Sequence, residues 1–298
     1  MQPSHNIILY YCYTPIDNPE VFRELHYHYC LQQGLRGRII IAKEGINGTL
    51  SGTPAACTKY MRDLKGDVRF ASTHFKVAAH DQHAFEKLHI RVKPEIVHAG
   101  LPHIAPNTPK GQYVTPTELQ RLQEDEAVVL LDVRSKYEHH IGHFKDAITL
   151  DIDNFRDFPG QVAQLAPYKE RKVVTYCTGG IKCEKASAYL LEQGFKDVYQ
   201  LHGGIIQYGL ETDGKDFEGK CYVFDNRLTV DINRSNPSVV GQCYLCHAAC
   251  DRTNLQCNRH VPICEGCSQE LQGACSRPCQ QTHAEALACS VGVTASAE

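Results

Sequence analysis

The chain has 298 residues, of which 42% are hydrophobic, and a formal net charge of −3 at pH 7. This length exceeds one ordinary domain, and the apolar content is sufficient for packed cores, so two or three domains are expected. No run approaches the roughly 18 apolar residues of a membrane helix, and no signal peptide is recognisable, so we expect a cytoplasmic protein without membrane contact. The small net charge does not by itself indicate a nucleic-acid binder.

The first hundred residues carry strand and helix signals in the order β-α-β-β-α-β, followed by one further strand. Apolar runs that predict strands lie at 7–13, 38–42, 49–51, 68–77 and 88–92. Asn18-Pro19 and Thr53-Pro54 each supply an N-cap and a first-turn proline, which predict helices that end near Gly34 and Leu64. This order predicts a ferredoxin-like α+β domain over residues 1–98, a fold that many unrelated functions share.

Two motifs of this region have more than one interpretation. The segment Gly45–Gly48 ends in Asn-Gly, which predicts a hairpin turn. Lys43 precedes this segment and would either line a functional site or face solvent. Along the last strand, His89, Arg91 and Lys93 alternate and therefore share one face. That basic face would either meet phosphates or be the solvated side of the sheet. Residues 1–100 carry a small excess of basic residues, so a polyanion would meet this region first.

A second domain is expected after residues 94–112, where closely spaced prolines and glycines predict a linker. A capping box at Thr115–Glu118 opens a helix, and strand signals then alternate with helix signals. The apolar run 127–131 predicts a buried parallel strand, which is followed by Asp132-Val133-Arg134. This alternation predicts a doubly wound α/β domain over residues 112–212, with ligands at the C-terminal ends of its strands.

The loop that begins at Cys177 is the strongest candidate for a catalytic site. Residues 173–176 predict a strand, and a helix is expected from Glu184 to Gln193. A cysteine at such a junction faces backbone N–H groups and the positive end of a helix dipole, which lower its pKa. Packing alone would explain a buried cysteine but not Gly179-Gly180, which lets the loop curl around a ligand. The candidate substrate and oxyanion loop consists of Thr178, Gly179, Gly180, Ile181, Lys182 and Cys183.

The last part of the chain is rich in cysteine. Its candidate metal ligands are Cys243, Cys246, Cys250, Cys257, Cys264, Cys267, Cys275 and Cys279. The two CxxC pairs predict a zinc-ribbon-like region over residues 220–283, in which each pair would close around one ion. Eight thiols would hold two structural zinc ions, and unmetallated or oxidised thiols are the alternative. Residues 284–298 are expected to be a frayed tail.

Several separated motifs of the central domain resemble the rhodanese family in order and spacing. They are Leu131–Arg134, Tyr137–Ile148, the Cys177 loop and Leu201–Gly204. The resemblance implies that Cys177 aligns with the rhodanese cysteine, which can carry a persulfide. The related cysteine phosphatases place an arginine where this chain has Cys183, so the fork that clamps a phosphate is missing and the phosphatase alternative is disfavoured.

Over about residues 5–280 the chain resembles the bacterial tRNA uridine hydroxylases. The segment Gly37–Gly52, the loop Cys177–Ala186 and the Cys-rich tail carry this resemblance. It implies oxygen-dependent conversion of uridine 34, the wobble base, to 5-hydroxyuridine, with molecular oxygen as co-substrate and the tRNA anticodon loop as partner. Lys182 stands where the family usually has arginine, which is expected to alter efficiency rather than abolish activity. The residues that would face RNA are Lys43, Arg91, Lys93 and Arg134.

The residues also suggest a chemical hypothesis. No flavin or haem fingerprint is evident in the sequence. A Cys177 thiolate that adds to carbon 6 of uracil would give an enolate, which can be oxidised at carbon 5 before the cysteine is eliminated. Backbone N–H groups of Gly179 and Gly180 would hold the developing oxyanion. Cys183 would either resolve an oxidised Cys177 or merely pack. A sulfurtransferase with a persulfide on Cys177 and a non-catalytic RNA-binding module are the alternative functions.

Overall fold

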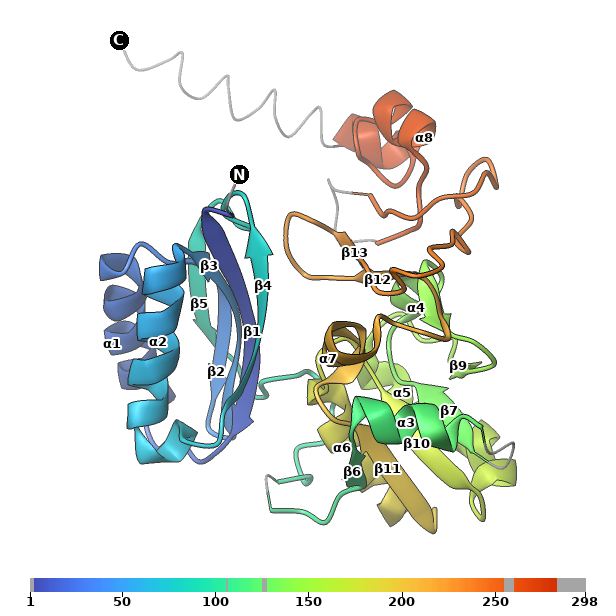
Figure 1. Ribbon diagram of the computed structural model, residues 1–298, viewed down its shortest axis with the longest axis horizontal. Coiled ribbons are helices and arrows are strands. Elements are labelled where there is room, and N and C mark those ends of the chain that lie inside the picture. The colour runs from blue at the N-terminus through green and yellow to red at the C-terminus, as the bar shows by residue number, and fades with distance from the viewer. Residues whose placement is uncertain (1–2, 106, 125–127, 255–259, 283–298) are drawn as a thin grey trace.

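The computed structural model describes residues 3–282 except 106, 125–127 and 255–259 (Figure 1). Within these residues an N-terminal sheet and a central sheet have five strands each, and a three-stranded sheet joins the central part to the tail. None of the described helices is long and apolar enough to cross a membrane.

The N-terminal region is an α/β sandwich with two helices on one face of its sheet (Figure 1). Strand order is β4-β1-β3-β2-β5, and all neighbours are antiparallel except β2 and β5. This topology confirms the ferredoxin-like prediction, with β5 as an added edge strand. The elements are β1 (His5–Tyr13), α1 (Pro19–Gln32), β2 (Arg36–Ala42), β3 (Gly45–Gly52), α2 (Pro54–Gly66), β4 (His74–His80) and β5 (Leu88–Val92).

The two faces of this sheet have different partners because side chains alternate along each strand. Ile8 and Tyr10 of β1 are fully buried in the core beneath the helices. Leu9 and Tyr11 therefore point away from the helices, toward the central domain. The face without helices is thus the surface that meets the Cys177 loop.

Two predictions for this region are wrong. The hairpin turn is at Lys43-Glu44, and Asn47-Gly48 lies inside β3. A Cβ at residue 48 would lie 2.6 Å from the Tyr10 hydroxyl oxygen, so this glycine serves packing rather than a turn. The predicted strand at 68–77 is also shifted, because Val68–Phe70 form a 3₁₀ helix and β4 begins at His74.

The central region is a parallel sheet in the order β6-β11-β10-β7-β9. Alternate residues of β7 and β10 enter two different apolar cores, one on each face, which confirms the doubly wound prediction. The elements are β6 (Gln112–Val114), α3 (Pro116–Leu122), β7 (Val129–Asp132), α4 (Lys136–His139), β8 (Gly142–Phe144), β9 (Ile148–Thr149), α5 (Phe158–Gln161), β10 (Lys172–Tyr176), α6 (Ile181–Glu192), β11 (Asp197–Leu201) and α7 (Gly204–Thr212).

The segment expected to be a linker is packed against the protein. Ala99, Leu101 and Ile104 are buried and belong to the apolar core of the central domain. Ile96 is also fully buried, and its carbonyl accepts a hydrogen bond from Asn47 Nδ2 at 2.9 Å. The connection therefore fixes the two domains to one another.

The third region begins with a strand that continues the central domain. β12 (Phe217–Tyr222) pairs with β8 on one side and β13 (Thr229–Asp231) on the other. The tail then folds around a small core of Cys243, Cys250, Ile263, Leu271 and Ala274. A short helix, α8 (Glu265–Glu270), closes it (Figure 1).

Arg134 does not face RNA, contrary to the sequence interpretation. Its side chain is fully buried, and its Nε and Nη2 donate to the Asp132 carboxylate at 2.9 and 2.6 Å. Nη2 also donates to the carbonyl of Gly142 at 2.6 Å. Burial acts to raise the pKa of Asp132, but the neighbouring guanidinium outweighs it and lowers that pKa. Arg134 thus neutralises a buried carboxylate and ties the end of β7 to β8.

Replacing Arg134 by Met should therefore destabilise the fold by about 3–5 kcal/mol, because Asp132 would remain buried without its counter-charge. Urea unfolding of the full chain measures this change. Arg121→Met, at an exposed position of α3, is the control and should change stability by less than about 0.5 kcal/mol. An Arg134→Met variant of normal stability with weakened RNA binding would restore the original interpretation.

Candidate functional site

The Cys177 loop turns tightly between β10 and α6. Gly180 has φ +98° and is the residue before the first turn of α6, a conformation that favours glycine. Its N–H donates to Cys177 Sγ at 3.1 Å. Only 1% of the Cys177 side chain is exposed, so its sulfur is held by the loop and largely removed from water.

The surroundings of Cys177 favour its thiolate. Burial acts to raise the pKa of Cys177, but the Cys183 thiol, the Lys182 ammonium and backbone N–H groups outweigh it and lower the pKa to about 6. Burial and the nearby Cys177 raise the pKa of Cys183 well above its ordinary value. Cys183 is therefore the neutral hydrogen-bond donor of the pair, and Cys177 is the group that ionises.

Lys182 is shared between two negative groups. Its Nζ lies 2.5 Å from Glu138 Oε2, and the Glu138 side chain is fully buried. The same carboxylate oxygen accepts the N–H of Ser135 at 3.0 Å, which caps α4. The ammonium thus neutralises Glu138 while it also attracts the Cys177 thiolate.

The first turn of α7 donates hydrogen bonds to the backbone of the Cys177 loop. Gly204 has φ +67°, and a Cβ there would lie 2.4 Å from the carbonyl oxygen of Cys177. The N–H groups of Ile205 and Ile206 donate to the carbonyls of Cys177 and Thr178 at 3.0 and 3.1 Å. The glycines after Leu201 therefore permit a close approach that no larger residue allows.

Lys76 of β4 is a site residue that sequence reasoning missed. Its Nζ donates to the carbonyl of Gly179 at 2.8 Å, and its side chain is only 3% exposed. Burial lowers its pKa to about 8, although the negative charges of Cys177 and Glu184 act in the opposite direction. In the part of the chain described here it forms no ion pair with a carboxylate. Its one signal in the sequence is a lysine inside an apolar strand.

The two residues that follow the loop on α6 dock the N-terminal domain. Glu184 Oε1 accepts a hydrogen bond from the Tyr11 hydroxyl at 2.9 Å. The Lys185 side chain is 2% exposed, and its Nζ lies 2.9 Å from Glu44 Oε2 and 2.7 Å from Glu95 Oε1. These contacts bring the helix-free face of the N-terminal sheet over the Cys177 loop.

A cavity of about 420 Å³ lies between that sheet face and the loop. The predicted loop residues Cys177, Thr178, Gly179, Ile181 and Lys182 line it. Its remaining polar and aromatic lining includes residues not predicted from sequence, among them Tyr11, Arg38, Asn47, His98, Tyr137 and Phe224. Residues from all three regions therefore meet around one thiol.

The predicted RNA-facing residues Lys43, Arg91 and Lys93 are exposed but do not line this cavity. Arg91 pairs in register with Ile40 of β2, so it shares the sheet face of Arg38 and Ile40, which do line it. Contact of these three side chains with RNA stays a prediction.

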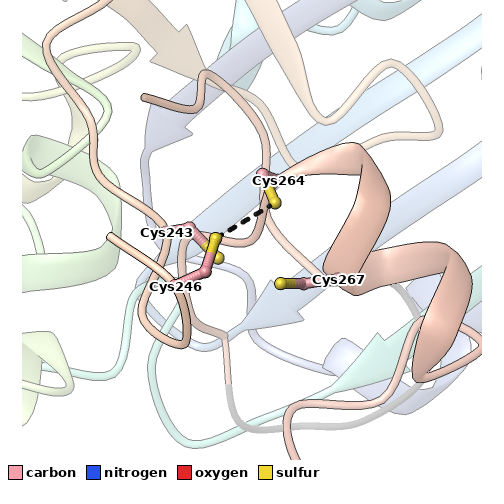
Figure 2. Close-up of side chains that lie close together, drawn as sticks. All are labelled: Cys243, Cys246, Cys264 and Cys267. Carbon is pink, nitrogen blue, oxygen red and sulfur yellow. Dashed lines mark hydrogen bonds between the residues drawn. The ribbon is translucent and has the colours of Figure 1, made fainter. Parts of the chain in front are cut away.

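The Cys-rich tail brings both CxxC pairs into one group (Figure 2). The sulfur atoms of Cys243, Cys246, Cys264 and Cys267 all lie within 4.8 Å of one another. Cys246 Sγ and Cys264 Sγ are 3.6 Å apart. Burial acts to raise the pKa of Cys243, but backbone N–H groups from both pairs lower it to about 6. Four thiols in this arrangement can bind one metal ion.

The two CxxC pairs thus share one position, and the number of ions that the eight predicted cysteines would hold stays a prediction. One tetrahedral ion uses four cysteines, so it would take both CxxC pairs. The tertiary fold brings the two pairs together, and the spacing within each pair does not predict this. Cys250 and Cys275 are buried and Cys279 is half-buried, but none of them belongs to the four-sulfur group found among the described residues. Cys257 lies outside the described residues.

Alkylation of Cys177 by iodoacetamide should rise with pH around a midpoint near 6 rather than near 8.5, because the thiolate is the reactive form. Lys182→Met should move this midpoint upward, since it removes a positive charge and leaves Glu138 unpaired. Lys136→Met on α4, whose ammonium pairs with exposed Asp151 and Asp153, is the control and should leave the midpoint unchanged. Mass spectrometry of the Cys177 peptide separates it from the other cysteines. An unchanged midpoint in Lys182→Met would show that Glu138 fully neutralises Lys182.

Three family models match successive parts of the chain. They describe a UPF0176 acylphosphatase-like domain at residues 5–96, a rhodanese-like domain at 115–210 and a rhodanese C-terminal region at 218–280. These ranges follow the three regions of the structure.

Relatives that span nearly the whole chain have one name in common. A protein of Cytophaga hutchinsonii is 56% identical over 281 residues, which cover 93% of this chain and 90% of the relative. One of Staphylococcus aureus is 43% identical, with 93% and 89% covered. One of Aster yellows witches'-broom phytoplasma is 46% identical, with 93% and 92% covered. Each is named tRNA uridine(34) hydroxylase, and this chain belongs to that family.

Proposed function

We propose that this chain hydroxylates carbon 5 of uridine 34 in tRNA with O₂ as the oxidant and Cys177 as the nucleophile. The observation that carries the proposal is an ionisable, buried cysteine on the wall of a cavity of about 420 Å³, in a member of this family. Cavities of this size bind small molecules, and a base of a single-stranded loop needs little unpairing to enter one. The predicted cytoplasmic location is consistent with tRNA as the substrate and stays a prediction.

Cys177 activates a carbon that does not react with oxygen by itself. Addition of its thiolate to carbon 6 of uracil moves an electron pair toward carbon 5 and the carbon 4 oxygen. Loop N–H groups and the cations Lys182 and Arg38 at the cavity wall favour this developing negative charge. The low pKa of Cys177 supplies the nucleophile near neutral pH.

Insertion of one oxygen atom from O₂ needs two further electrons, which a thiol reductant supplies. Carbon 5 takes one oxygen atom from O₂, and the other leaves as water with two protons and two electrons from two thiols, which become a disulfide. The carbon 5 proton and the carbon 6–sulfur bond are then lost together. This elimination restores the aromatic ring as 5-hydroxyuridine and returns the Cys177 thiolate.

Sulfur transfer through a persulfide on Cys177 is the alternative function. The rhodanese loop is compatible with it, because a persulfide forms on the same activated sulfur. It is less well supported than hydroxylation, since the relatives that match over the whole chain are named hydroxylases.

We also propose that Cys243, Cys246, Cys264 and Cys267 hold one structural zinc ion. Four thiolates close the coordination sphere of zinc and leave no position for substrate, so the ion would stabilise the tail rather than react. The core of this region contains few apolar side chains, and metal binding would contribute much of its folding free energy.

An unmodified tRNA transcript incubated with the purified protein, O₂ and a dithiol reductant should gain one oxygen atom on uridine 34. Nuclease digestion and mass spectrometry measure this product. Strict anoxia and the Cys177→Ala variant should each abolish it, whereas Cys12→Ala, which changes a buried cysteine in the N-terminal core, should retain activity. A gain of sulfur, or full activity of Cys177→Ala, would contradict the proposal.

The purified protein should contain about one zinc ion per chain, because two CxxC pairs form one tetrahedral site. Cys264→Ser should lose the metal and unfold at a lower temperature. Cys279→Ser, which lies outside the four-sulfur group, should keep it. Elemental analysis and thermal unfolding test this expectation, and two ions per chain would contradict a single site.

A further inference from the structure

Phe224 places an aromatic ring at the edge of the Cys177 cavity. It follows β12 and is 45% exposed, although it lines the cavity. The Tyr222 ring contacts it edge to face, with centroids 5.1 Å apart, and Lys182 Nζ lies 5.8 Å from its centroid. The ring is therefore held in position by its neighbours while a large part of it stays open to solvent.

The groups around this ring are of the kind that sites for single-stranded RNA contain. Arg38 is exposed and lines the same cavity, so a cation lies on the N-terminal side as well as at Lys182. Tyr137 lines the cavity and packs against Tyr222, with centroids 5.2 Å apart. Exposed aromatic faces beside cations stack unpaired bases and attract the phosphates between them.

Entry of one base into a cavity leaves its neighbour with an uncovered face. Uridine 34 must leave the anticodon stack to reach Cys177, because the sulfur is buried in the cavity wall. The adjacent nucleotide then lies at the cavity mouth without its stacking partner. An aromatic ring at that mouth can replace the lost partner.

We propose that the Phe224 ring stacks with the base of a nucleotide adjacent to uridine 34, at position 33 or 35, and so positions the target base over Cys177. This proposal rests on the proposed function, because it takes tRNA as the substrate. It makes Phe224 a positioning residue for RNA.

Binding of full-length protein to an unmodified tRNA transcript under anoxia tests the stacking. Phe224→Ala should weaken binding by about 5- to 150-fold, the range that loss of one base–aromatic stack gives. Phe224→Trp should bind like the wild type, and Phe224→Leu should remain weak because it restores bulk without an aromatic face. Leu210→Ala is the matched control and should bind normally, since Leu210 is 44% exposed and lines a neighbouring cavity but not the one around Cys177.

A fluorescent base gives a direct readout. Transcripts with 2-aminopurine at position 33 or at position 35 should show quenching at one position on binding wild-type protein and Phe224→Trp, and no quenching with Phe224→Leu. The pH midpoint of Cys177 alkylation by iodoacetamide should be the same in the wild type and Phe224→Leu, which shows that the thiolate and its loop are intact. Phe224→Leu binding as tightly as the wild type, or unchanged quenching in this variant, would overturn the proposal.

The experiments distinguish failure of the proposed reaction from failure of the proposed stacking by Phe224. Quenching that depends on Phe224 without any hydroxylation by the wild type would overturn the proposed reaction and retain the stacking. Hydroxylation with binding and quenching independent of Phe224 would retain the reaction and overturn the stacking.

Discussion

A buried thiolate is the constraint on which the rest of this structure depends. Removing a negatively charged sulfur from water is costly unless nearby dipoles and cations replace the lost hydration. Gly180 donates its N–H to the sulfur, Lys182 lies near it, and Lys76 is bound to the carbonyl of Gly179 in the same loop. The rhodanese-like loop supplies the first two groups, and the N-terminal domain supplies the third. The positive potential around Cys177 is therefore a property of the assembled chain.

The order of residues after Cys177 joins this chemistry to domain docking. Gly180 closes the loop, Lys182 faces the cavity, and Glu184 and Lys185 contact the N-terminal domain. One helix thus begins directly after the loop of the nucleophile and, within its first turns, contacts the domain that covers it. The interface residues Glu184 and Lys185 therefore lie within two turns of chain beyond the loop that holds the sulfur.

The sequence predicts local features well and contacts between distant segments poorly. The caps at Asn18, Thr53 and Thr115 are set by neighbouring residues, and the structure has each of them. The parallel strands and the glycine loop at Cys177 were also predictable, because apolar runs and glycine pairs are local signals.

Contacts between distant segments were not predictable. Lys76 was missed because its partner Gly179 is over a hundred residues away in the chain, so no spacing rule connects them. Arg134 was misassigned because only the fold shows that Asp132 is buried beside it. The four-sulfur group likewise depends on how the two CxxC pairs approach one another.

The position of Lys185 between Glu44 and Glu95 also bears on how far the central domain can be considered alone. An excised central domain would expose this ammonium to water and would lack Lys76 beside the loop. Its cysteine would then have a different reactivity although every residue of its own loop was present. The unit that sets the chemistry of Cys177 is therefore larger than the domain that contains it, and grafting the loop onto another rhodanese-like scaffold would transfer the motif without its electrostatic environment.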